Sequence, residues 1–65
     1  SQESVRKLMP NDDIPPGLVV IHPTFGRGTV RGTSDHGESR KVLVQFARVG
    51  LKKLLLRQAN LGVFD

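Results

Sequence analysis

Residues 22–30 read His-Pro-Thr-Phe-Gly-Arg-Gly-Thr-Val and lie between two segments rich in β-forming residues. Pro23 fixes its own φ at about −65°, whereas Gly26 and Gly28 can adopt a positive φ at little steric cost. Phe25 is the large apolar side chain that can hold such a turn against a core. These residues therefore predict a tight turn that joins two strands.

Apolar and β-branched residues on both sides of this turn predict four strands, at residues 18–22, 28–33, 40–46 and 51–56. Gly32 lies inside the second strand and indicates a bulge or bend. The Pro-Gly pair at residues 16–17 predicts a type II turn in front of the first strand. Residues 57–61 predict a short helical turn, with Ala59 and Leu61 covering an open end of the sheet. Val63 and Phe64 are either frayed or a small addition to this apolar cover.

The whole chain has 65 residues, which corresponds to one small domain. Four or five short strands joined by tight turns favour an all-β fold, a small SH3-like or Tudor-like barrel, because closure removes exposed sheet edges. Residues 1–16 are mostly polar and interrupted by prolines, so we predict that they form a flexible linker or arm. The barrel domain is then expected to span residues 17–65.

Composition restricts the possible functions. The chain contains no cysteine, so it can form neither a disulfide nor a thiolate metal site. It has no membrane-length apolar run and no signal-peptide pattern, and we therefore expect a soluble, cytoplasmic protein. Residues 1–16 carry two basic and three acidic side chains, whereas residues 17–65 carry eight basic and three acidic ones. This balance predicts an acidic partner, either a nucleic acid or an acidic protein surface.

No pattern in the sequence predicts catalysis, a metal ion or a cofactor. His22 and His36 lie in different loops without metal-ligand spacing, and His22 is expected to be a structural hydrogen-bonding group. Ser34, Asp35 and His36 are adjacent on one loop and cannot converge as a hydrolase triad. The chain has no Trp or Tyr, and Phe25 and Phe46 are expected in the core. An aromatic cage for methyl-lysine or a groove for polyproline is therefore excluded.

Basic residues are the remaining candidates. They gather around the fourth predicted strand and beside the turn at residues 22–30. One interpretation is that they only protect an edge strand and keep the protein in solution. The other is that they dock an acidic partner, which could add a strand to the sheet. Lys52 and Lys53 point to opposite faces of a strand, so one is expected in solvent and the other across the barrel rim, packed on leucines.

Segments 20–30, 42–46, 49–55 and 59–61 together resemble the C-terminal Tudor-like domain of bacterial UvrD/PcrA-type DNA helicases. The resemblance implies a five-stranded adaptor barrel attached to an ATP-dependent helicase. It also implies docking onto RNA polymerase during transcription-coupled repair or R-loop removal, with Lys52 at the polymerase-facing basic position. Leu18 and Arg27 depart from the family pattern. The turn is also similar to that of CarD-like transcription factors, but the later strands are not.

Two binding modes remain open at this point. The resemblance implies that RNA polymerase is bound through Lys52, helped by Arg27, Arg48 and Lys53. The alternative is sequence-nonspecific DNA binding through phosphate contacts, with Arg31, Arg40, Lys41 and Arg57 as the contributing residues. In either mode we expect a monomer that does not contact a membrane.

Overall fold

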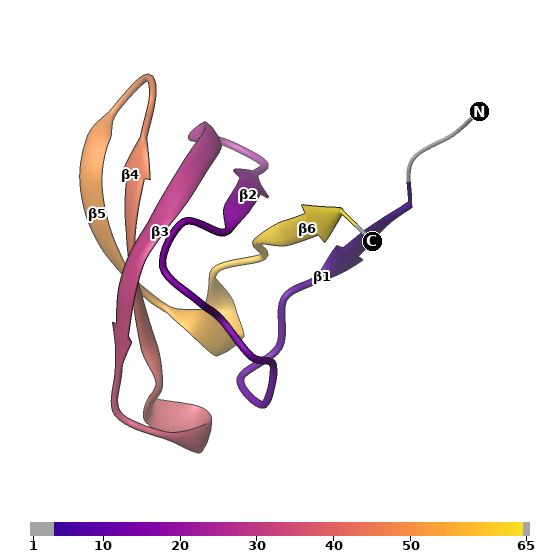
Figure 1. Cartoon of the computed structure of the whole chain (residues 1–65), viewed down its shortest axis with the longest axis vertical. Helices are drawn as coiled ribbons and strands as arrows, with labels where there is room; N and C mark the ends of the chain where they lie inside the picture. The colour runs from indigo at the N-terminus through magenta and orange to yellow at the C-terminus, as the bar shows by residue number, and fades with distance from the viewer. Residues whose placement is uncertain (1–3, 65) are drawn as a thin grey trace.

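The computed structural model of the protein describes residues 4–64. They form one antiparallel sheet, with strand order β1-β6-β2-β3-β4-β5 (Figure 1). Two short 3-10 helices, η1 and η2, connect β3 to β4 and β5 to β6. The elements are β1 (Val5–Lys7), β2 (Val19–His22), β3 (Gly26–Ser34), η1 (Gly37–Ser39), β4 (Lys41–Phe46), β5 (Gly50–Leu55), η2 (Leu56–Gln58) and β6 (Gly62–Phe64).

The four strands expected from the sequence are confirmed as β2 to β5. The turn before β2 is also confirmed, because the Leu18 N–H donates to the Pro15 carbonyl over 3.2 Å and Gly17 has a φ of 95°. The bulge is present as well: the pairing of β3 with β4 shifts register between Val30 and Gly32, which leaves Arg31 as the additional residue. Local turn chemistry therefore determines these elements.

The number of strands and the closure of the sheet differ from the prediction. The sheet has six strands rather than four or five, and it is open. Strands β1 and β5 are its two edges, and no pairing within residues 4–64 joins them into a closed barrel. The contact of β6 with β2 is a single pair, Ile21 with Gly62. This short contact joins the small β1–β6 ribbon to the four-stranded part.

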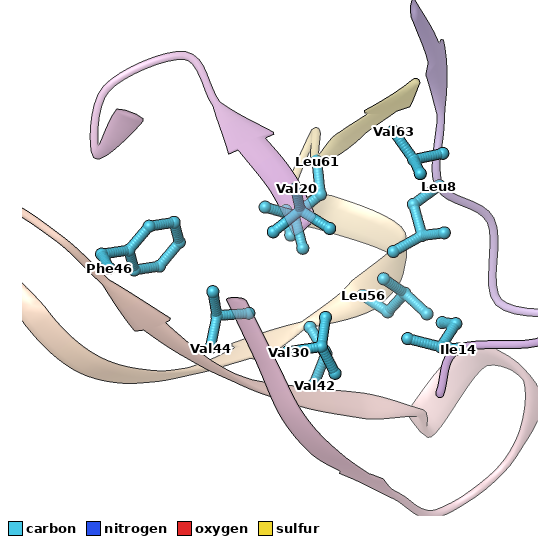
Figure 2. Close-up of a cluster of buried hydrophobic side chains, with 11 residues drawn as sticks. Leu8, Ile14, Val20, Val30, Val42, Val44, Phe46, Leu56, Leu61 and Val63 are labelled. Atoms are coloured by element: carbon cyan, nitrogen blue, oxygen red, sulfur yellow. The ribbon is translucent and has the colours of Figure 1, made fainter. Parts of the chain in front are cut away.

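One hydrophobic core holds these strands together (Figure 2). Strand β4 alternates along its length, so three of its six side chains point into the core and are almost fully buried. Because the other members come from β2, β3, β6, η2 and the N-terminal segment, the sheet must bend around this cluster. The buried residues are Leu8, Ile14, Val20, Val30, Val42, Val44, Phe46, Leu56, Ala59, Leu61 and Val63.

In the C-terminal part the predicted helical turn and apolar cover are confirmed, and the structure adds a strand, β6, that was not predicted. Residues 56–58 form the helical turn η2, and Ala59 and Leu61 are buried beyond it. Val63 is buried in strand β6, so this end contributes to the core and is not frayed. None of the helices within residues 4–64 is long and apolar enough to cross a membrane.

The predicted flexible arm is wrong for the part of residues 1–16 that the structure describes; residues 1–3 lie outside it. Strand β1 pairs with β6, and the Leu8 N–H donates to the Leu61 carbonyl over 2.8 Å. Leu8 is 1% exposed and Ile14 is 5% exposed, and Figure 2 shows Leu8 beside Val63 and Ile14 beside Leu56. A domain this small gains much of its stability from a few such side chains. Burial of these two apolar residues therefore helps to order a mostly polar segment.

Polar contacts also fix this N-terminal segment. The Asp12 carboxylate accepts the Met9 N–H over 2.7 Å and the Arg6 guanidinium over 3.0 Å. The Met9 N–H, with a further contribution from Arg6, lowers the pKa of Asp12 below its ordinary value. One Arg40 nitrogen, Nη1, donates to the carbonyls of Pro10 and Asp12, each over 2.8 Å. The segment is thus bound to the sheet by both apolar and polar contacts.

Candidate functional site

The turn between β2 and β3 is built around His22. Its Nδ1 accepts the backbone N–H groups of Thr24 and Phe25, each over 3.0 Å. A ring nitrogen that accepts hydrogen bonds carries no proton, so the proton of the neutral ring lies on Nε2. The sequence-based prediction of a structural, hydrogen-bonding His22 is confirmed.

The two glycines of this turn have different roles. Gly26 has a φ of 81°, which is the positive value expected from the sequence. Gly28 does not have a positive φ, so it does not use the conformational freedom that the sequence allowed. A Cβ at Gly28 would lie 2.5 Å from Val44 Cγ1 and 2.7 Å from Phe46 Cδ1. Gly28 is therefore required because the β4 side chains pack directly against its backbone.

Three rings pack beneath the turn. The ring of His22 stacks on Phe25 with centroids 4.3 Å apart and planes 15° apart. Phe46 meets both rings edge-on, with its centroid 5.3 Å from that of Phe25 and 5.9 Å from that of His22. Phe46 is fully buried, whereas Phe25 is half-buried and packs against the core from outside. Phe25 thus connects the core to the surface at this end of the sheet.

Lys52 lies over this half-buried ring. Its ammonium nitrogen is 5.6 Å from the Phe25 centroid, within the range of a cation–π interaction. Lys52 pairs with Val44 across strands β5 and β4, so it belongs to the core-facing side of the sheet. Lys53 therefore points to the opposite face, as the sequence predicted. One of the two lysines was expected to pack on leucines at the rim. Lys52 instead lies there over the aromatic ring of Phe25.

Two arginines lie at the same end of the sheet. The Arg48 side chain covers Gly26, since a Cβ at that glycine would be 3.5 Å from Arg48 Cδ. Arg27 is exposed, and its carbonyl accepts the Ala47 N–H over 3.2 Å, which ties the β2–β3 turn to the β4–β5 turn. We call Arg48 and Lys52, which lie beside Gly26 and Phe25, the basic turn surface. It brings together two of the four residues predicted to bind a protein partner. Arg27 belongs to the same end of the sheet but points to the opposite face from Gly28, whose Cβ direction meets the core side chains Val44 and Phe46.

Lys53, the fourth predicted residue, lies on the other face of the sheet. It borders a shallow hollow of about 180 Å³ above the β3 bulge. Lys41 lies at this hollow too, and it is ion-paired with Asp35 over 3.0 Å. The hydrogen bond from Lys41 lowers the pKa of Asp35 below its ordinary value. The hollow is lined by Gly32, Thr33, Ser34, Lys41, Leu43 and Lys53.

Of the four residues predicted for DNA binding, three have partners in the chain. Arg40 holds the N-terminal segment through two backbone carbonyls, and Lys41 is paired with Asp35. Arg57 donates from Nε to the Glu38 carbonyl over 3.2 Å. Arg31 is exposed at the β3 bulge. Arg40 is thus a structural residue, a role that its sequence context did not indicate.

The sequence did not indicate that Phe25 contributes to the surface. Its position in the turn suggested a core side chain. Its contact with Lys52 depends on the register of β5, which hydrophobic periodicity does not determine. Within the described residues 4–64, no group of three or more His, Cys, Asp or Glu side chains is placed to hold a metal ion.

Comparison with known proteins gives one family match. The family model described as the PcrA/UvrD tudor domain matches residues 17–61. This range contains β2 to β5, η2 and the whole basic turn surface, and it ends just before β6. The search of curated proteins gives no match for the chain.

Proposed function

The chain belongs to the PcrA/UvrD tudor domain family, and on this basis we propose that it is a non-catalytic module that docks a DNA helicase onto RNA polymerase. The observation that carries the proposal is the placement of Lys52. Its charged group is exposed, lies over the Phe25 ring, and has Arg48 and Arg27 at the same end of the sheet. An acidic surface on the polymerase would complement this arrangement.

Phe25 should lower the entropy that Lys52 loses when it binds a partner, compared with an ordinary surface lysine. A free lysine loses side-chain entropy when a partner fixes it in one conformation. The ring face restrains the Lys52 ammonium before binding, so less entropy is lost on docking. Lys52 is therefore the residue on which polymerase binding should depend most.

Attached to an ATP-dependent helicase motor, the domain would recruit unwinding activity to transcription complexes. Repair of transcribed DNA and removal of RNA–DNA hybrids are the processes that such recruitment would serve, and the cytoplasm is where both occur in a bacterium. The domain itself would contribute only binding, as a non-catalytic accessory module of the helicase.

The test is a binding titration of the domain against RNA polymerase with Lys52→Ala. We expect a loss of affinity of about tenfold or more with an unchanged melting temperature, as for the central residue of an interface. Lys7→Ala is the matched control, because it removes the same charge from β1 at the opposite edge of the sheet. Polymerase binding that is equal for Lys52→Ala and the native protein would contradict the proposal.

A parallel titration with short DNA separates the alternative function. Phosphate-mediated binding weakens steeply as salt rises. We expect polymerase binding to persist at near-physiological salt and DNA binding to disappear. DNA binding that persists while polymerase is ignored would instead identify the domain as a DNA-binding module.

A further inference from the structure

Strand β5 forms a long free edge of the sheet. It pairs with β4 on one side, and no strand within residues 4–64 pairs with its other side (Figure 1). It has six residues, whereas β1 at the opposite edge has three. An unpaired edge of this length presents a row of backbone donors and acceptors that can bind another strand.

The register identifies the backbone groups that are free. The Leu56 N–H donates to the Arg40 carbonyl over 2.9 Å, so Leu56 occupies a hydrogen-bonded position opposite the strand that leads into β4. Hydrogen-bonded and non-bonded pairs alternate along an antiparallel ladder. Leu55 pairs with Lys41 in the next, non-bonded position. The residues whose N–H and C=O groups therefore point away from β4 are Leu51, Lys53 and Leu55.

The side chains of this edge form a specific pattern. On the outer face, Lys53 lies between Leu51, which is 55% exposed, and the half-buried Leu55. On the core-facing side, Lys52 is next to Leu54. Two adjacent lysines thus place one positive charge on each face at the centre of the edge, with apolar side chains around them. A second copy of this strand would be repelled, whereas an acidic strand would be attracted.

We propose that β5 accepts an antiparallel strand from an acidic protein partner, which extends the sheet by main-chain hydrogen bonds. This inference rests on the proposed function and adds the geometry by which the partner is recognised. Residues opposite Lys53 and Lys52 would be acidic, and those opposite the leucines would be apolar. Because the partner runs from Leu55 toward Leu51, its sequence pattern is apolar-apolar-acidic-acidic-apolar.

Isomeric peptides test this pattern directly. A peptide with the central sequence Val-Val-Glu-Glu-Val is compared with one containing Glu-Val-Val-Val-Glu, which has the same composition and charge but places each glutamate opposite a leucine. We expect the first to bind at least about tenfold more tightly. On binding, the amide protons of Leu51, Lys53 and Leu55 should exchange more slowly with solvent. Equal affinities, or protection elsewhere, would overturn the proposal.

Leu55→Pro tests the edge without changing any charge. Leu55 has a φ of −75°, which proline adopts, and its N–H points away from β4, so the substitution removes a free donor and no ladder bond. Leu55→Ala is the control, because it shortens the side chain and keeps the N–H. We expect Leu55→Pro to bind the acidic peptide about tenfold more weakly than Leu55→Ala, with both variants folded by circular dichroism. Equal binding by the two variants would overturn strand addition.

The same variants separate this inference from the proposed function. If Lys52→Ala weakens polymerase binding but Leu55→Pro and Leu55→Ala bind polymerase equally, docking stands and strand addition is wrong. If the acidic peptide binds β5 while polymerase does not bind the domain, strand addition stands and the assigned partner is wrong.

Discussion

His22 determines the β2–β3 turn in two separate ways. Its Nδ1 accepts two backbone N–H groups, and its ring stacks on Phe25. The hydrogen-bonding role could be predicted from a polar ring placed directly before a proline in a tight turn. The stacking could not, because it depends on the rotamer that Phe25 adopts above Phe46. Two substitutions distinguish these contributions.

His22→Ala removes both the acceptor and the ring, and we expect it to lower the free energy of unfolding by about 1–3 kcal/mol. His22→Asn restores an acceptor, because an asparagine side chain before a turn accepts a backbone N–H two residues on. Urea denaturation should therefore place His22→Asn between the native protein and His22→Ala. If the two variants are equally unstable, the ring stacking and not the hydrogen bonds fixes the turn.

Gly28 and Gly32 provide a matched pair of substitutions within β3. A Cβ at Gly28 would overlap Val44 and Phe46, whereas a Cβ at Gly32 would meet no atom within 4 Å. We expect Gly28→Ala to lower the free energy of unfolding by about 2 kcal/mol or more, as overpacking does. Gly32→Ala should change it by less than about 1 kcal/mol. Thermal melts of both variants check this, and similar losses would contradict the close packing described at Gly28.

At the scale of elements, the sequence predicted strands correctly where the local hydrophobic pattern agrees with the side chains that pack in the core. Apolar and β-branched residues together with the glycine-containing turns identified β2 to β5, with strict alternation in β4. The N-terminal segment was misjudged, because its order depends on long-range contacts: Leu8 with the Leu61 carbonyl, and Arg40 with the carbonyls of Pro10 and Asp12. Neither contact leaves a periodic signal within residues 1–16. Strand β6 was missed for the same reason, since it is three residues long and its partners are distant.

The Asp12 carboxylate makes the packing of this segment sensitive to acid. Its pKa is lowered in the folded state, so the ionised form stabilises the fold above the ordinary aspartate value of about 4. This stabilisation is lost as pH falls through the lowered pKa. We expect Asp12→Asn to be less stable than the native protein at pH 6 and the difference to shrink toward pH 3, measured by urea denaturation.

Asp13→Asn is the control for this prediction. It removes the same charge from an exposed neighbour and should lower the stability at pH 6 much less. A difference between Asp12→Asn and the native protein that stays constant from pH 6 to pH 3 would show that the ionised carboxylate does not hold the segment.

At the scale of the whole molecule, the basic character followed from composition, and the assignment to an all-β Tudor-like fold was correct. The open sheet was not predictable, because strand count alone does not determine whether the first and last strands meet. The opposite orientation of Lys52 and Lys53 was predictable from strand alternation, whereas the face that each one occupies was not, because it depends on the register of β5. Lys52 lies over Phe25 because the β2–β3 turn and the β4–β5 turn meet at one end of the sheet, where the Ala47 N–H donates to the Arg27 carbonyl.

The open sheet makes the lysines of β5 relevant to the oligomeric state. Two copies of β5 pairing antiparallel would bring four lysines together, which should keep the native protein monomeric. Replacing both, as Lys52→Thr with Lys53→Thr, removes this repulsion and introduces a residue that favours strands. We therefore expect the double variant to form dimers or larger assemblies in sedimentation equilibrium. Lys7→Thr with Arg31→Thr removes two charges away from β5 and should remain monomeric. Association of both double variants would point to net charge as the cause, and association of neither would show that the β5 lysines do not protect the edge.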